Sequence, residues 1–330
     1  MKQDKYKKTN TLIIAKKTRK RASKMSKNKM RQYLPFYLML IPGFIYLLVN
    51  NYMPMAGLFL AFKKVNYALG LWKSPWIGLS NFSYLINSND ALLIFRNTIL
   101  YNLGFIILGN LMGIFVAIAL DSIRRKFFKR FSQTIILIPF LLSTVIVSYI
   151  VFAFLSPSNG FVNKSILPIF GLEPISWYNQ AKYWPAIITI VYLWMSFGYT
   201  SILYYSNLIG IDKAYYEAAV VDGAGIWKQT IHITLPSLKY MIITLVLLSI
   251  GRIFYSDFGL FYQVPMHSGL LYSTTQTIDT YVFRGLLELN DIGRSSAASF
   301  LQSVLGFIFV YVANKIVYKI DKSSALFETR

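Results

Sequence analysis

Residues 217–236 read EAAVVDGAGIWKQTIHITLP and form a polar interruption in a strongly apolar part of the chain. On the N-terminal side, residues 183–211 carry no charge, and on the C-terminal side residues 240–250 read YMIITLVLLSI. The interruption contains a glutamate, three alanines, an Asp-Gly pair and a terminal Leu-Pro. A segment of this composition between two long apolar stretches predicts a loop between membrane helices.

The composition of the whole chain supports a membrane protein. The 330 residues are 55% hydrophobic and 17% aromatic, and 14% are charged, whereas soluble domains usually carry about 25% charged residues. The chain has no cysteine, which excludes disulfides, thiol catalysis and cysteine-ligated zinc. Its two histidines, His232 and His267, have no second ligand at metal spacing, so we expect no metal site.

Basic residues are concentrated at the N-terminus. The net charge is +21, and residues 1–31 supply +12 of it through thirteen Lys or Arg and one Asp. With little hydrophobic patterning, residues 1–32 are expected to form a disordered cytoplasmic tail. Attraction to anionic lipid and control of topology explain such a tail better than RNA binding does.

Long uncharged windows predict the membrane helices. We place six spans at residues 34–62, 97–120, 131–155, 183–209, 236–256 and 295–314. If the N-terminus is cytoplasmic, 25 of the 34 Lys and Arg fall in cytoplasmic segments and 8 in extracytoplasmic segments. The remaining one, Arg96, lies at the edge of a span. This asymmetry predicts that both termini, and the loop at 217–236, are cytoplasmic.

The predicted spans contain no acidic residue, which disfavours a proton-coupled carrier. We also find neither an inverted repeat nor a glycine-rich phosphate loop of the GxxxxGK[ST] type. If the chain moves a solute, its energy is therefore expected to come from another protein.

A membrane-embedded enzyme is the competing class, since it needs only a nucleophile or an acid–base pair near one interface. The predicted outer loops offer several acids, none of which pairs with a histidine, and we expect them to be solvated loop charges. These acids are Glu173, Asp257, Asp279, Glu288 and Asp291.

Polar and small residues within the spans have two interpretations. Helix packing through small residues and interhelical hydrogen bonds explains most of them. A pore lining is the alternative, in which aromatic rings stack on the CH faces of sugar rings. Our candidates for such a pathway are Ser148, Tyr149, Tyr192 and Trp194.

The loop itself predicts a helix from Tyr215 to Val221, a turn at Asp222-Gly223 and Gly225, and a second short helix over 226–234. Pro236 then suits the first turn of the next membrane helix. The small alanine side chains allow another protein's backbone to approach closely, with Glu217 and Asp222 as anchors. An ordinary amphipathic connector remains the alternative on physical grounds.

The spacing of the loop resembles a known signature. Glu217-Ala218-Ala219, then three residues, Gly223, nine residues, Ile233, one residue and Leu-Pro is similar to the signature loop of permease subunits from binding-protein-dependent ABC importers. We call residues 211–236 the EAA loop. Segments at 42–67, 74–82, 256–265, 278–286 and 299–316 resemble the polysaccharide and oligosaccharide subgroup, so the resemblance covers roughly 33–320.

The resemblance implies an all-α, six-span permease domain at 33–320, of the type I ABC importer permease fold, with a C-terminal cytoplasmic tail at 321–330. It implies a non-catalytic bacterial plasma-membrane subunit that conducts an oligosaccharide and has no cofactor of its own, since ATP and Mg are bound by partners. The implied partners are a second, homologous permease, two cytosolic ATPases and an extracytoplasmic solute-binding protein. The residues expected to contact the ATPase or shape the loop are Glu217, Ala218, Ala219, Asp222, Gly223, Ala224, Gly225, Ile233, Leu235 and Pro236. A permease for another solute, such as amino acids, and an enzyme acting on lipid-linked sugars remain the alternatives.

Overall fold

The computed structural model describes residues 32–320, 322 and 325–327. Within these residues the regular structure is helical, apart from one isolated bridge between Lys63 and Trp76. The expected disorder of the basic tail at 1–32 concerns residues outside this range, except for Gln32, which begins the first helix. The chain divides into two compact units, one ending at Phe59 and one running from Leu60 onward, and each is described by itself.

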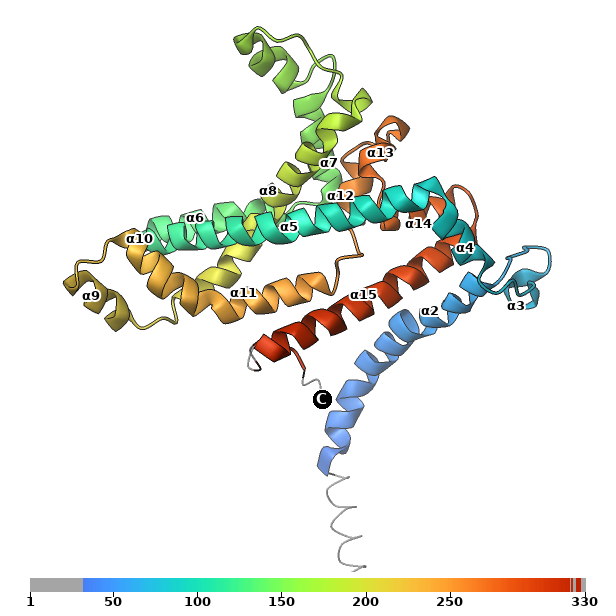
Figure 1. Ribbon diagram of the computed structural model, residues 1–330, viewed down its shortest axis with the longest axis horizontal. Helices are drawn as coiled ribbons and strands as arrows, with labels where there is room; N and C mark the ends of the chain where they lie inside the picture. The colour runs from blue at the N-terminus through green and yellow to red at the C-terminus, as the bar shows by residue number, and fades with distance from the viewer. Residues whose placement is uncertain (1–31, 321, 323–324, 328–330) are drawn as a thin grey trace, which may run out of the picture. The chain divides into compact units, whose positions relative to one another are not determined.

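The first unit consists of most of one apolar helix, drawn in blue in Figure 1, which runs from Gln32 to Phe62. It contains a π-helical segment η1 (Leu48–Tyr52), then α2 (Met53–Met55) and the 3-10 segment η2 (Ala56–Phe62). Pro54 lies in the first turn of α2, where its missing N–H removes one helical hydrogen bond and accounts for the irregular turn. At 31 residues and about 1.5 Å per residue, this helix is long enough to cross a bilayer, as the first predicted span requires.

The second unit contains four further long apolar helices and one bent pair. The long helices are α5 (Asn89–Ser122), α8 (Trp184–Leu208), α11 (Leu235–Ile250) and α15 (Ile292–Ile320), and the pair is α6 (Lys126–Leu141) with α7 (Thr144–Leu155). Among the described residues, five helices are long and apolar enough to cross a membrane, or six if the pair counts as one span. The all-α, six-span prediction is confirmed in this sense.

Short helices connect the long ones. They are α3 (Gly70–Lys73), α4 (Ser80–Asn87), η3 (Val162–Ile166), η4 (Leu167–Phe170), η5 (Trp177–Asn179), η6 (Ala181–Tyr183), α9 (Lys213–Val221), α10 (Ile226–Gln229), η7 (Thr230–Thr234), α12 (Phe258–Gln263), η8 (Gly269–Leu271), α13 (Tyr272–Thr275) and α14 (Ile278–Leu287).

The third predicted span is not one straight helix. Its two halves, α6 and α7, meet at an angle of 95° at Leu142-Ser143. Pro139 removes a backbone donor near the end of α6, and the extended Ser143 starts α7 by accepting a hydrogen bond from the Val145 N–H. The prediction of a continuous helix over 131–155 is therefore wrong at this break.

The fifth predicted span differs at both ends. It begins earlier, because α10, η7 and α11 run on as one helix from Ile226 to Ile250; the expected separate helix over 226–234 is its first part. It also ends earlier, because the chain leaves the helix after Gly251 instead of near residue 256. The π-helical η7 directly precedes Pro236, whose ring cannot continue an ordinary hydrogen-bond ladder.

Within the second unit, α5 packs against α8, and α8 also contacts α6 and α11 (Figure 1). Helices α6 and α8 approach closely because residue 198 of α8 is a glycine. A β-carbon at Gly198 would overlap the carbonyl group of Ile136 in α6. α15 packs against α14, α4 and α11. A further cluster of buried side chains joins α5, α7, α8 and α12 and includes Trp184, Ile188 and Phe261.

Candidate functional site

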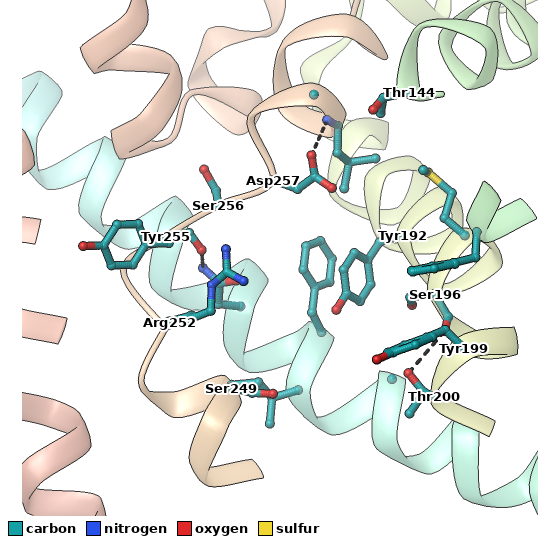
Figure 2. A pocket seen from close by; sticks show the side chains of 18 of the residues that line it. Thr144, Tyr192, Ser196, Tyr199, Thr200, Ser249, Arg252, Tyr255, Ser256 and Asp257 are labelled. Carbon is teal, nitrogen blue, oxygen red and sulfur yellow. Dashed lines mark hydrogen bonds between the residues drawn. The ribbon is translucent and has the colours of Figure 1, made fainter. Parts of the chain in front are cut away.

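The second unit contains a cavity of about 880 Å³ that is lined mainly by residues of helices α5, α6, α8, α11 and α12 (Figure 2). Small-molecule sites in proteins commonly measure about 300–1,000 Å³. The cavity is therefore large enough for several sugar rings or a molecule of comparable size.

An irregular segment forms one wall of the cavity. After α11 ends at Ile250, residues 251–257 leave the helical path, and Arg252, Tyr255, Ser256 and Asp257 from this segment line the cavity. Irregular backbone at membrane depth is tolerated only where other protein groups or water satisfy its hydrogen bonds. The segment must therefore be held by side chains from its neighbours.

Three side chains provide this support. Asn102, in the middle third of α5, donates from its amide to the carbonyls of Ile253 and Tyr255 at 2.9 and 3.0 Å. Gln302 of α15 donates to the carbonyl of Phe254 at 2.6 Å. Asp279 of α14 accepts the backbone N–H of Ser256 at 2.7 Å. The unwound segment is thus fixed from α5, α14 and α15.

Asp279 has a different role from the one expected. Besides the Ser256 N–H, its carboxylate accepts the Ser256 hydroxyl at 2.8 Å and the Gln302 amide at 3.2 Å. The prediction that this acid is a solvated loop charge is wrong, because Asp279 ties α14 and α15 to the cavity wall. Among the other acids, Asp291 is paired with Arg294 at 3.2 Å, and Asp257 accepts the N–H of Leu260 as the cap of α12.

Two stacked aromatic pairs form part of the cavity wall. The rings of Phe105 and Tyr192 are nearly parallel, with centroids 3.7 Å apart, and those of Phe140 and Tyr199 stack at 4.7 Å. Packing against a neighbour holds each ring in one orientation. Such fixed, flat apolar faces with a hydroxyl at the edge are suited to the CH face and hydroxyls of a pyranose ring.

The four candidate pathway residues are not brought together. Tyr192 lines the cavity. Ser148 is buried, and its hydroxyl donates to the Val145 carbonyl of its own helix. Tyr149 and Trp194 are outside the cavity lining. The sequence did not single out Tyr199 or Arg252 for the pathway. The charged and polar side chains of Arg252, Ser256 and Asp257 were the available signal, and residues up to 256 were assigned to the end of a span.

The EAA loop forms a compact second feature. Asp212 caps the start of α9 by accepting the Ala214 N–H. At the other end, Gly223 has φ +73°, while its N–H bonds the Val220 carbonyl and the N–H of Ala224 bonds the Ala219 carbonyl. This is the Schellman arrangement, in which the left-handed position favours glycine. The turn predicted at Asp222-Gly223 is confirmed.

Gly225 differs from Gly223. It precedes α10 with φ −68° and ψ 170°, a conformation open to any residue. The amide of Gln229 donates back to the Ala224 carbonyl at 2.7 Å, and the hydroxyls of Tyr216 and Thr234 lie 3.0 Å apart. The loop is thus tied to the start of the long helix and is a defined structural unit.

The predicted contact residues lie on two parts of this loop. Glu217, Ala218, Asp222 and Gly223 are exposed on α9 and its turn, and Ala219 and Ala224 are half-buried. Beyond Gly225, the residues Ile233, Leu235 and Pro236 lie within the long helix, in η7 and the first turn of α11. Large apolar side chains flank the turn and are mostly exposed, namely Val221 at 87%, Ile226 at 76% and Trp227 at 80%. Exposed apolar groups concentrated in this way are typical of surfaces that contact a protein or a membrane.

Comparison with known proteins places these features in context. The profile of the family described as "Binding-protein-dependent transport system inner membrane component" matches residues 109–321. Protein LplB of Bacillus subtilis is 34% identical over 286 residues, which are 87% of this chain and 89% of LplB. The polygalacturonan/rhamnogalacturonan transport system permease protein YteP of the same organism is 33% identical over 93% of this chain and 94% of YteP.

The fold also matches a solved structure. A chain of a bacterial ABC transporter involved in the import of the acidic polysaccharide alginate superposes with a TM-score of 0.81 at 30% identity, covering 89% of this chain and 98% of that one. The same similarity holds for that transporter in complex with an alginate pentasaccharide-bound periplasmic protein, at 29% identity.

Proposed function

The chain belongs to the family of binding-protein-dependent transport system inner membrane components, and on that premise we propose that it is the permease subunit of an ATP-driven ABC importer of oligosaccharides. The sugar passes through the cavity between α5, α8 and the irregular segment 251–257. Relatives that are named for carbohydrate transport and match nearly the whole chain support this substrate class.

One observation carries the proposal: a single helix joins the EAA loop to the cavity. The helix begins at Ile226 within the loop, ends at Ile250, and is followed at once by Arg252 in the cavity wall. Its 25 residues span about 37 Å at 1.5 Å per residue. A displacement imposed on the loop is therefore transmitted along a rigid element to the wall that contacts the substrate.

We assign the loop to the ATPase. The exposed turn at Asp222-Gly223 and the apolar side chains around it fit a groove on a cytosolic ATPase subunit, with Glu217 as a charged anchor. The complex then contains two such ATPases, which bind ATP and Mg. A second, homologous permease completes the pathway, and an extracytoplasmic solute-binding protein delivers the sugar. Both termini of this chain lie in the cytoplasm of a bacterial cell.

The two alternatives make different demands. An amino-acid importer would use the same loop with a different solute in the cavity. An enzyme acting on lipid-linked sugar would need the outer acids for chemistry, yet Asp279 is engaged by Ser256 and Gln302 and Asp291 by Arg294. These bonds support a structural use for both carboxylates, with ATP hydrolysis left to the partner subunits.

The proposal is tested with the purified complex of this chain and its copurifying subunits in proteoliposomes. Uptake and ATP hydrolysis are measured with panels of oligosaccharides and amino acids. We expect stimulation by at least one oligosaccharide. Stimulation only by amino acids, or turnover of a sugar substrate without any ATPase partner, would overturn the proposal.

A further inference from the structure

We infer that Arg252 recognises a carboxylate on the transported sugar, so that the substrate is an acidic, uronate-containing oligosaccharide. The inference rests on the proposed function and specifies its substrate class. It starts from the charges in the cavity: among the residues that line it, Arg252 and Asp257 are the charged ones.

The Arg252 side chain reaches into the cavity without a protein partner. It follows directly on the end of α11, and Figure 2 shows its guanidinium turned toward the open space between Ser256 and Tyr192. Among the described residues, the guanidinium makes no ion pair or hydrogen bond. Its five N–H donors are therefore available to a ligand.

The position of this cation in the cavity wall strengthens the argument. Arg252 is exposed and lies two residues after the end of α11, and Asn102 of α5 bonds the carbonyls of its neighbours Ile253 and Tyr255. A charged side chain within a membrane segment is costly and almost always faces a pathway or a counter-charge. An arriving anion would offset the cost of this one.

Asp257 does not serve as that counter-charge. One oxygen of its carboxylate accepts the N–H of Leu260 at 3.0 Å and so caps α12. No ion pair joins Asp257 to Arg252. The acid is thus committed to the helix start, whereas the arginine is not committed to a protein group.

The shape of the site favours a sugar carboxylate. The planar guanidinium forms two parallel hydrogen bonds with a carboxylate, and the stacked Tyr192 and Phe105 lie on another wall of the same cavity. A uronate ring offers both complementary parts, a CH face for the aromatic wall and a carboxylate at the ring edge. The backbone at 253–256 is clamped by Asn102, Gln302 and Asp279, which keeps the arginine in place.

The test uses the complete importer in proteoliposomes and matched trisaccharides. The acidic members consist of galacturonate, mannuronate or glucuronate, and each is compared with its carboxyl-reduced and its methyl-esterified counterpart. We expect at least one acid to stimulate ATP hydrolysis and uptake about tenfold more effectively than its two neutral forms. Transport confined to neutral members would overturn the inference and leave the proposed function standing, whereas failure of every sugar would overturn the proposed function.

Variants then assign the preference to Arg252. We expect Arg252→Gln to reduce uptake of the acid about tenfold or more with little effect on a neutral form, because one charge-assisted pair is lost. Arg252→Lys should still prefer the acid, but by a smaller factor than the original, because lysine keeps the charge and lacks the planar guanidinium. Arg294→Gln removes a cation outside the cavity and is the matched control. It should change neither the uptake of the acid nor the uptake of the neutral form. If Arg252→Gln does not insert, the comparison of acid with ester on the unmodified importer still decides whether the substrate is acidic. If Arg252→Gln inserts and loses acid and neutral transport equally, the inference is contradicted.

Discussion

The carboxylate of Asp279 accepts both the backbone N–H and the hydroxyl of Ser256, at 2.7 and 2.8 Å. The two residues belong to different elements, since Asp279 lies in the first turn of α14 and Ser256 in the irregular segment after α11. The same carboxylate accepts the amide of Gln302 from α15. One acid therefore sets the position of a cavity wall relative to two neighbouring helices.

Replacement of this acid should loosen the wall. In Asp279→Asn, an NH₂ group takes the place of one acceptor oxygen and faces the donors of Ser256 or Gln302. Because hydrogen bonds to a charged group contribute about 1.5–3 kcal/mol each, we expect a loss of about 2 kcal/mol or more of stability and reduced uptake. Thermal unfolding in detergent and proteoliposome uptake provide the two measurements.

Glu173→Gln is the matched control for that change. Glu173 is exposed, so its neutralisation should alter stability by less than about 0.5 kcal/mol. An equal effect of the two substitutions would show that Asp279 is an ordinary loop charge. If Asp279→Asn kept full stability but abolished turnover of a sugar substrate without any ATPase, the enzyme alternative would be favoured.

The two glycines of the EAA loop make opposite predictions. Gly223 has φ +73° and Gly225 φ −68°, and at both positions a β-carbon would meet nothing within 4 Å. Gly223→Ala must hold alanine in the left-handed region at a cost of about 1–2 kcal/mol. Gly225→Ala should be neutral or stabilising by up to about 1 kcal/mol, because it restricts the unfolded chain without strain.

Sugar-stimulated ATP hydrolysis and thermal unfolding of both variants test this contrast. We expect Gly223→Ala to insert, to unfold at a lower temperature and to couple poorly, since the turn that presents Asp222 to a partner is distorted. Identical behaviour of the two variants would mean that the left-handed turn is not needed for coupling.

Close packing of α6 against α8 depends on Gly198. A β-carbon at this position would overlap the backbone carbonyl of Ile136, and a carbonyl cannot move without moving its helix. We expect Gly198→Ala to cost about 1–3 kcal/mol and to lower the yield of folded protein. Gly104→Ala in α5 is the control, because its β-carbon meets nothing within 4 Å and alanine favours a helix by about 1 kcal/mol. Gel filtration of both variants after extraction gives the comparison, and equal yields would contradict the packing argument.

Sequence patterning predicted most of the helices, because uncharged apolar windows of about twenty residues are typical of membrane spans and rare in soluble domains. It did not predict the breaks. Proline and serine occur in many continuous membrane helices, so Pro139 and Ser143 alone did not indicate the 95° bend between α6 and α7. The fifth span was predicted to reach residue 256 because of its apolar composition. Composition alone does not show that the helix unwinds after Gly251.

The site shows the same limit. The turn at Gly223 follows from local chemistry and was predicted. The role of Asp279 depends on Gln302, which is 23 residues away, and the role of Asn102 depends on carbonyls about 150 residues away. A single sequence carries no signal for such pairs, so an acid in a connecting segment was taken for a solvated charge. Candidate pathway residues were chosen by type, and the cavity is defined by which helix faces meet.

The last prediction concerns the exposed face of the EAA loop. Glu217 is exposed, and its side chain forms no hydrogen bond or ion pair with any residue that the structure describes. Trp227 is 80% exposed. Neither side chain supports the fold of this chain, so Glu217→Lys and Trp227→Ala should leave thermal unfolding of the isolated permease within about 0.5 kcal/mol of the original. If a partner docks here, both should weaken its retention, because an aromatic anchor at an interface is often worth about 2 kcal/mol or more.

Copurification of the ATPase subunit on the tagged permease measures that loss, and we expect about a tenfold decrease for each variant. Tyr240→Ala is the control, since Tyr240 is also an exposed aromatic residue but lies beyond the loop on α11. Retention of the ATPase by Glu217→Lys and Trp227→Ala at the level of Tyr240→Ala would place the docking surface elsewhere. Loss of the ATPase in all three variants would point to a general effect of surface aromatic and charged groups on assembly. Loss in only the two loop variants would show that the ATPase acts on the helix that ends beside Arg252.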